Sequence, residues 1–331
     1  MSWSARDKHS AIAKLPYESL LQILTYMSYD GLAQCVRVCR LWSAVASDSS
    51  LWATVDLSKV RSKLFSDADV SSFICAQIVG NAKTIAVRNP YYLSGRDLSP
   101  LLSALGYAKR PTRSQLQTLK LENYQGLDCN ALSFCLASPS IGHNLHTISL
   151  HGTHVDNTVI RALCQNKAIC ANLRQLDLSF CAIRSDNVRL IADTLQTLEG
   201  LSLSGNLAIE GEAIEYLLKK QGTHLSSLEL RFIWGLHASW FVDYFNKSVE
   251  GGVKFLDIRG CEHFTRKDLR QLSGICPDAK VLSSVVLEDD SIEGYQQFLY
   301  MMATASIADD IPVSVDIVSD LPIMKNSSIW V

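Results

Sequence analysis

Hydrophobic residues recur at helical spacing in the first organised part of the chain. Leu20, Ile23, Leu24 and Met27 follow one another at three- and four-residue steps, so they form one apolar face of a helix. Pro16 stands near the predicted start of this helix, where its missing N–H costs little. The pattern predicts a short amphipathic helix that ends at the Asp-Gly pair of residues 30–31.

Two further short segments continue this helical pattern. Their apolar residues are Leu32, Cys35, Val36 and Cys39 in one segment and Leu41, Trp42, Val45 and Ala46 in the other. Three helices of this size bury little surface by themselves. We therefore expect the unit to pack against a neighbour, either later in the same chain or in a partner protein.

Further along, the apolar pattern becomes a repeat of the form Leu-x-x-Leu-x-Leu, with other aliphatic residues allowed. The repeat begins at residues 116, 145, 173, 198, 225 and 253, with weaker copies at 52, 82, 279 and 315. The steps between the six strong copies have the leucine-rich-repeat period, and helical spacing fills the stretches between them. The sequence therefore predicts an α/β fold in which three N-terminal helices lead into a curved solenoid, with parallel strands on the concave face and helices on the convex face.

Eight residues after each strong start, an Asn or Cys side chain is expected to bind backbone groups of the turn. Three positions fit: Cys181, Asn206 and Cys261. Three do not: Tyr124, Thr153 and Ile233. The pattern predicts irregular turns at these three.

Residues that flank each central leucine point away from the core and toward the concave face. The candidates for binding a partner there are Lys120, Glu122, His151, Asp177, Glu229, Arg231, Phe255, Asp257 and Arg259. Arginine beside aromatic residues is frequent in binding hot spots. The alternative is a solvated face with cross-strand ion pairs, Glu229 with Arg259 or Arg231 with Asp257.

Composition and charge narrow the function classes. The 331 residues are 47% hydrophobic and 19% charged, which is enough to build a large core. Lysine and arginine number 31 against 33 acidic residues, so no overall field attracts nucleic acid or an anionic membrane. Ten cysteines without a Cys-x-x-Cys motif, and no apolar run long enough to cross a membrane, favour the cytoplasm or the nucleus.

Catalytic and metal-binding patterns are missing from the sequence. His143 and His146, and then His151 and His154, surround one predicted strand, where their rings diverge rather than converge on a metal. There is no phosphate-binding glycine motif and no nucleophile with an identifiable base. We expect a protein without catalytic residues, metal or cofactor.

The helical unit resembles an F-box across residues 15–52. The residues that carry the resemblance are Leu15, Pro16, Glu18, Leu20, Ile23, Leu24, Tyr26, Met27, Leu32, Val38, Cys39, Arg40, Trp42, Leu51 and Trp52. Two departures are mild: Met27 stands where leucine is usual, and Gly31 precedes the customary leucine. Methionine conserves the volume of leucine.

The resemblance implies a partner, since F-boxes dock on the Skp-type adaptor of cullin-RING (SCF) ubiquitin ligases. By the family pattern, the interface residues would be Leu15, Pro16, Leu20, Ile23, Leu24 and Leu32. Val36, Val38 and Trp42 would either contact the adaptor or support the helices. Apolar anchors of this kind usually carry the affinity of a helix-mediated interface.

The combination resembles the F-box/leucine-rich-repeat family over nearly the whole chain. It implies a flexible N-terminus (1–10), an F-box (11–51), leucine-rich repeats (52–300) and a C-terminal cap and tail (301–331). We expect a substrate receptor of an SCF ligase that binds an unknown protein substrate, with or without a phosphate on it. The alternative is a ligase-independent scaffold or inhibitor similar to the ribonuclease-inhibitor class, in which Leu20, Leu24 and Leu32 would be buried within the chain rather than available to a partner.

Overall fold

One parallel sheet runs through the described part of the protein, with its strands in sequence order. The computed structural model describes residues 15–58, 67–88, 98–107, 114–221, 225–247, 253–261, 264–275 and 280–283. The strands are β1 (Thr54–Asp56), β2 (Thr84–Arg88), β3 (Thr118–Glu122), β4 (Thr147–Ser149), β5 (Gln175–Asp177), β6 (Gly200–Ser202), β7 (Ser227–Glu229), β8 (Phe255–Asp257) and β9 (Lys280–Leu282). The expected N-terminal segment 1–10, the C-terminal part 301–331 and the repeat copy at 315 lie outside the described residues.

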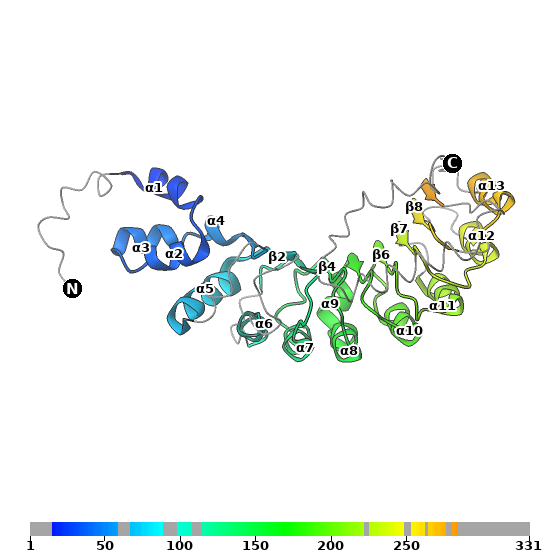
Figure 1. The fold of residues 1–331 in the computed structure, drawn as a ribbon, viewed down its shortest axis with the longest axis horizontal. Helices are drawn as coiled ribbons and strands as arrows, with labels where there is room; N and C mark the ends of the chain where they lie inside the picture. Colours follow the sequence, from blue (N-terminus) through cyan, green and yellow to red (C-terminus); the bar gives the residue numbers. More distant parts are fainter. Residues whose placement is uncertain are drawn as a thin grey trace, which may run out of the picture.

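Helices line the opposite side of the solenoid from the strands (Figure 1). The N-terminal unit contains α1 (Tyr17–Leu24), α2 (Tyr29–Cys35), α3 (Arg40–Ala46) and α4 (Ser49–Trp52). The solenoid contains α5 (Ala68–Asn81), α6 (Ser99–Gly106), α7 (Cys129–Ala137), α8 (Asn157–Gln165), α9 (Lys167–Asn172), α10 (Ser185–Thr194), α11 (Gly211–Gln221), α12 (Ala238–Lys247) and α13 (Arg266–Ile275). Each crossover from strand to strand therefore passes over the convex face, and the α/β solenoid with an N-terminal helical unit is confirmed.

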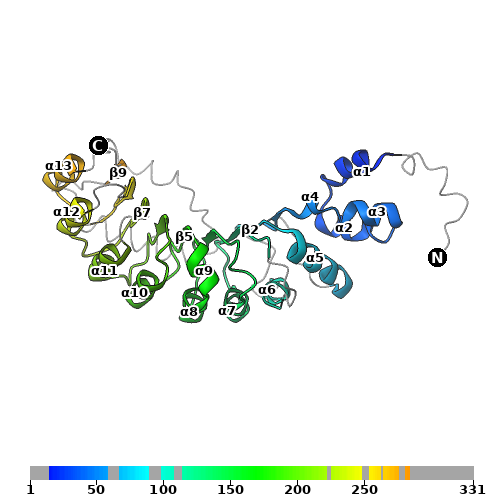
Figure 2. The same cartoon turned by 180° about the vertical axis from the view of Figure 1, so that it is seen from behind.

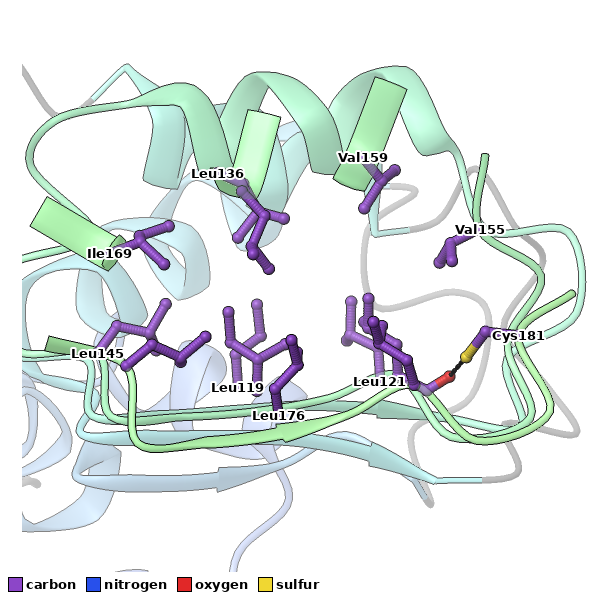
Figure 3. Close-up of a cluster of buried hydrophobic side chains, with 14 of the residues drawn as sticks. Leu119, Leu121, Leu136, Leu145, Val155, Val159, Ile169, Leu176 and Cys181 are labelled. Carbon is purple, nitrogen blue, oxygen red and sulfur yellow. Dashed lines mark hydrogen bonds between the residues drawn. The ribbon is translucent and has the colours of Figure 1, made fainter. Parts of the chain in front are cut away.

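Strand register explains why the leucine repeat builds a core. The central residue of each strand lies opposite the central residue of the next, as Ile148 does opposite Leu119 on one side and Leu176 on the other. In Figure 3, Leu119 and Leu176 point from the sheet toward the helical layer, where Leu136 and Val159 lie. All five are essentially buried. A side chain at this repeat position is thus enclosed by the neighbouring repeats as well as by its own helix.

Aspartates begin several of the convex helices. Asp67, Asp128 and Asp156 each accept hydrogen bonds from two backbone N–H groups of the helix that follows. Such caps satisfy donors that have no partner inside the helix, and they add favourable charge at its N-terminus. These caps fix the residue at which each of the three helices begins.

The turns after β4, β5 and β8 are each held by one side chain that reaches back to the preceding repeat. The Cys181 thiol donates to the Leu150 carbonyl at 2.9 Å, a contact drawn in Figure 3, and the Cys261 thiol donates to the Leu230 carbonyl at 2.9 Å. Thr153 performs the same task, because its hydroxyl donates to the Leu121 carbonyl at 2.8 Å. The prediction that Thr153 does not fit the turn pattern is therefore wrong: a hydroxyl supplies the same donor as a thiol.

The helical unit joins the first repeat without a linker, since α4 ends at Trp52 and β1 begins at Thr54. Trp52 is fully buried, and its indole N–H donates to the Ala46 carbonyl at 2.8 Å. Its ring packs against Tyr29 at 5.6 Å and against Phe73 of α5 at 5.8 Å, measured between ring centroids. The junction is therefore part of the same continuous core as the repeats.

Candidate interaction surfaces

The N-terminal helices bury some of the residues that the sequence assigns to an interface. Leu20, Leu24 and Leu32 are at most 2% exposed and belong to the core of the chain itself. The structure therefore does not place these three residues on the surface, where a direct contact with a partner would require them. The physical reason is that α1 and α2 turn these leucines inward, against α3 and α5, to which their helices pack.

Other apolar residues of the same helices face outward. At the end of α1, Ile23 is 48% exposed and Tyr26 is 86% exposed, and Met27 is also exposed. Val38, between α2 and α3, is 53% exposed, and Leu41, in the first turn of α3, is exposed. We call these five residues the apolar surface of the helical unit. Because they are exposed within one short helical unit, these five apolar side chains make it a candidate interaction surface.

Among the described residues, nine large hydrophobic side chains are exposed, and six of them fall within residues 17–41. The sequence assignment included Ile23 and Val38 but missed Tyr26, Met27, Leu41 and also Tyr17, which hydrogen-bonds Asp48. The remaining assigned residues lie between these extremes: Pro16 is exposed, and Leu15, Val36 and Trp42 are half-buried.

A hydrogen-bonded network of small polar residues crosses the middle of the concave face. The Ser179 hydroxyl donates to Asp177 and lies 2.7 Å from the Ser202 hydroxyl. The Ser202 hydroxyl lies 3.2 Å from Glu229. Asp177 also accepts a bond from the Ser149 hydroxyl at 3.5 Å. The middle strands β4 to β6 therefore carry polar side chains that hydrogen-bond one another.

The C-terminal strands bring four of the predicted residues together. Asp257 is 1% exposed and forms two hydrogen bonds with Arg259, at 2.9 and 2.7 Å. Arg231 lies 3.5 Å from both Asp257 and Glu229. The expected pair of Arg231 with Asp257 is present, whereas Glu229 pairs with Arg231, two residues after it in the chain, rather than with Arg259. These bonds to Asp257 raise the pKa of Arg259, which stays charged.

The other concave candidates lie outside this group. Glu122 pairs with Arg88 at 3.1 Å across β3 and β2, and the His151 ring packs edge-on against Phe180. Lys120 and Phe255 are half-buried on β3 and β8. The predicted concave residues are thus spread over several local environments rather than gathered in one site.

Left-handed backbone marks the edge where the strands end. The same repeat position has φ between 51° and 71° in six successive repeats, at Asn123, Gly152, Phe180, Gly205, Phe232 and Gly260. A large residue in this conformation is strained, and sequence reasoning did not single these positions out. The rings of Phe180 and Phe232 occupy the space where a side chain would start at Gly205 and Gly260. Each glycine therefore makes room for the phenylalanine of the preceding repeat.

The buried thiols are expected to be unreactive. Desolvation raises the pKa of Cys135 and of Cys261 to about 12, and that of Cys164 to about 11. Because the thiolate is the nucleophile, these side chains are poor candidates for catalysis. Among the described residues, no group of three or more His, Cys, Asp or Glu side chains is arranged to hold a metal ion. In the same part of the chain, every helix is too short or too polar to cross a membrane.

These pKa values predict protection of the thiols. In the folded protein at pH 8, iodoacetamide should leave Cys135, Cys164 and Cys261 unmodified, and the three should react after unfolding in urea. Folded thiols stay neutral above about pH 8.5, where unfolded thiols ionise, so their contribution to stability falls as the pH rises from there toward 12. Peptide mapping by mass spectrometry checks the labelling, and rapid modification of Cys135 in the native state would contradict it.

Known proteins resemble this chain over its N-terminal unit or over a larger part of its length. The F-box-like family matches residues 12–58. A lysine-specific demethylase 2A from Xenopus tropicalis is 25% identical over 237 residues, which cover 63% of this chain and 20% of that protein, so the chain spans about a fifth of that relative. In the solved structure of the Rad7 and Elc1 complex from yeast, the matching chain is 11% identical with a TM-score of 0.37, over 89% of this chain and 86% of that one.

Proposed function

We propose that this chain, an F-box-like domain continued by a leucine-rich-repeat solenoid, is the substrate-recognition subunit of an SCF (Skp–cullin–F-box) ubiquitin ligase. The F-box-like domain would bind a Skp-type adaptor and, through it, a cullin-RING ligase, while the repeats would bind a protein substrate. Catalysis then belongs to the other subunits, in the cytoplasm or the nucleus. This chain contributes proximity, because it raises the effective concentration of a substrate lysine near the ubiquitin-carrying enzyme.

The observation that carries the proposal is the apolar surface of the helical unit. Ile23, Tyr26, Met27, Val38 and Leu41 are exposed within the segment that matches the F-box-like family. A helical cap that served only the solenoid would need its apolar side chains on the inner side alone. Burial of Leu20, Leu24 and Leu32 is what the scaffold alternative expects, but that alternative gives no role to the five exposed residues.

The packed contact between the helical unit and the first repeat supports the proposal of a receptor that holds its substrate in a fixed position. Trp52 and Tyr29 tie the helical unit to β1 and α5, and the Tyr29 hydroxyl accepts a bond from the Asp56 N–H at 3.0 Å. Figure 2 shows the helical unit at one end of the solenoid and β9 near the other. A substrate on the concave face would therefore keep a defined distance from the adaptor.

A binding assay with a purified Skp-type adaptor tests the proposal. The double variant Ile23→Ala/Val38→Ala should bind the adaptor about 100-fold more weakly, because exposed apolar anchors at the centre of an interface each contribute on the order of 1–2 kcal/mol. Both side chains are about half exposed, so the fold should survive the change. By contrast, Leu20→Ala/Leu24→Ala would damage the core and confuse folding with binding.

The matched control is Tyr107→Ala/Phe134→Ala, which removes two exposed aromatic side chains from the convex side of the solenoid. This variant should bind the adaptor as the wild type does. Calorimetric titration and circular dichroism on all three proteins separate binding from folding. If the folded wild type does not bind any Skp-type adaptor, the receptor proposal fails and the scaffold alternative replaces it.

A further inference from the structure

One carboxylate in the middle of the concave face is held by neutral groups alone. Asp177 on β5 is half-buried, and it accepts hydrogen bonds from the backbone N–H of Ser179 at 2.9 Å and from the hydroxyls of Ser149 and Ser179. Among the described residues, no lysine, arginine or histidine forms an ion pair with Asp177. Because a cation is the strongest partner for a partly buried carboxylate, its charge is open to one from outside the chain.

The arginines of β7 and β8 do not neutralise Asp177, because they are paired with other carboxylates. Arg231 lies 3.5 Å from both Glu229 and Asp257. Arg259 forms two hydrogen bonds with Asp257, at 2.9 and 2.7 Å. These two arginines and two carboxylates balance one another, so the charge of Asp177 is left over.

Lys120 is too far away to pair with Asp177. Lys120 lies opposite Ser149 in the register of β3 and β4, and Ser149 lies opposite Asp177 in that of β4 and β5. Two strand spacings separate the backbones of residues 120 and 177 by about 10 Å. This distance exceeds the screening length of about 8 Å at physiological ionic strength, so the attraction between the two side chains is weak.

The strand beside Asp177 carries very small outward side chains. Gly200 and Ser202 of β6 lie opposite Gln175 and Asp177 of β5. The side-chain oxygen of Gln175 occupies the space where a side chain would start at Gly200. Gln175 is exposed, and its amide has no hydrogen-bond partner among the described residues. A second oxygen acceptor therefore lies on the same face of β5 as the Asp177 carboxylate.

The hydroxyls next to Asp177 have more acceptor atoms than protons. The Ser179 hydroxyl donates to Asp177, the Ser202 hydroxyl donates to Glu229 at 3.2 Å, and the two hydroxyl oxygens lie 2.7 Å apart. Each hydroxyl has one proton, so two protons serve three oxygen–oxygen contacts. An incoming group that only donates hydrogen bonds suits this row better than a group that also needs donors.

We infer that β5 and β6 bind a cationic side chain, lysine or arginine, of a protein substrate, with the cation on Asp177. Ammonium and guanidinium groups carry the missing charge and have donors but no acceptors. The inference rests on the proposed function and gives it a substrate class: proteins that present a basic segment to the middle of the solenoid, where Figure 2 shows β5.

A peptide array tests the inference without knowledge of the substrate. The full chain is applied to dodecapeptides in which one central position is fixed as each amino acid in turn and the others are mixtures. Binding should be strongest where lysine or arginine is fixed. For a fluorescein-labelled peptide with the best lysine, replacement of that lysine by glutamine should weaken binding about tenfold by anisotropy. Asp177→Asn should cause a similar loss, because it keeps the shape of the side chain and removes its charge.

A second variant leaves Asp177 in place. Gln175→Lys puts an ammonium group on the same face of β5, two residues from Asp177, where it should neutralise the carboxylate from within the chain and weaken peptide binding. Gln175 is exposed, so the fold should survive this change. The matched control is Glu212→Gln, which removes one exposed carboxylate from α11 and changes the net charge as Asp177→Asn does. This control should bind as the wild type does, and thermal circular dichroism checks that all variants fold.

Three results would overturn the inference: no preference for lysine or arginine on the array, unchanged affinity in folded Asp177→Asn or Gln175→Lys, or an equal loss in Glu212→Gln. The last result would mean that basic peptides are attracted by overall charge alone. Peptide binding is measured without the adaptor, so a failure of adaptor binding removes the proposed receptor role and leaves this result intact. Adaptor binding that persists in Asp177→Asn shows that only the concave site has changed.

Discussion

Replacing Trp52 with alanine should lower the free energy of unfolding by about 3–5 kcal/mol, the usual cost of truncating a large aromatic residue in a core. Trp52 is fully buried between Tyr29 of the helical unit and Phe73 of the first repeat. Its loss opens a cavity at the joint and leaves the Ala46 carbonyl without its indole donor. Urea denaturation followed by circular dichroism measures the change.

The conservative variant Trp52→Phe provides the control. It keeps an aromatic ring in the site but cannot donate to Ala46, so its loss of stability should be smaller than that of Trp52→Ala. In Trp52→Ala we also expect limited proteolysis to cut near the joint before it cuts the solenoid, because local opening follows local stability. A fall of less than about 1 kcal/mol would show that the two parts do not share a core.

Asn206→Ala should be as damaging, with a loss of about 3–5 kcal/mol from backbone groups that lose their partners. The buried Asn206 amide donates to the carbonyls of Leu178 and Leu203, both at 2.8 Å. Its oxygen accepts from the backbone N–H groups of Cys181 and Ile183. One side chain thus satisfies the turns of two successive repeats, and its removal leaves these buried backbone groups without their side-chain partner.

Thr153→Val tests the same position in another repeat with a smaller change. The Thr153 hydroxyl accepts from the Tyr124 N–H at 3.0 Å and donates to the Leu121 carbonyl. Because only two backbone groups are affected, we expect a loss of about 1–3 kcal/mol, less than for Asn206→Ala. Chemical denaturation of both variants gives the comparison. Equal losses of unfolding free energy in the two variants would show that the number of broken hydrogen bonds does not determine the destabilisation.

Both changes bear on the proposed receptor role. A substrate bound by the repeats would be held at a distance from the helical unit that depends on the turns of the solenoid and on the contact at Trp52 (Figure 2). Replacing Trp52 weakens the contact between the helical unit and the first repeat. Replacing Asn206 weakens the turns in the middle of the solenoid. Variants that stay folded but lose ubiquitination of a bound substrate would connect this stiffness to function.

The repeat period in the sequence was sufficient to predict the architecture, because each leucine repeat specifies one strand within a short stretch of chain. Starts at residues 116, 145 and 173 placed the strands that the structure has at Thr118–Glu122, Thr147–Ser149 and Gln175–Asp177. The spacing also identified which leucines enter the core, since alternation along a strand assigns each side chain to one face. Cys181 and Cys261 were predicted to hold the turns, and both do.

Only the tertiary structure decided which apolar residues of the helical unit meet solvent. Helical spacing groups Leu20, Leu24 and Ile23 together, yet two are buried and Ile23 is exposed, because small helices have several apolar faces and packing chooses among them. The partner of Glu229 also had to come from the structure, since the sequence offered Arg259 whereas Glu229 lies 3.5 Å from Arg231. The sequence by itself thus determined the order and type of the elements through local periodicity, and the packing of distant segments determined the surfaces they present.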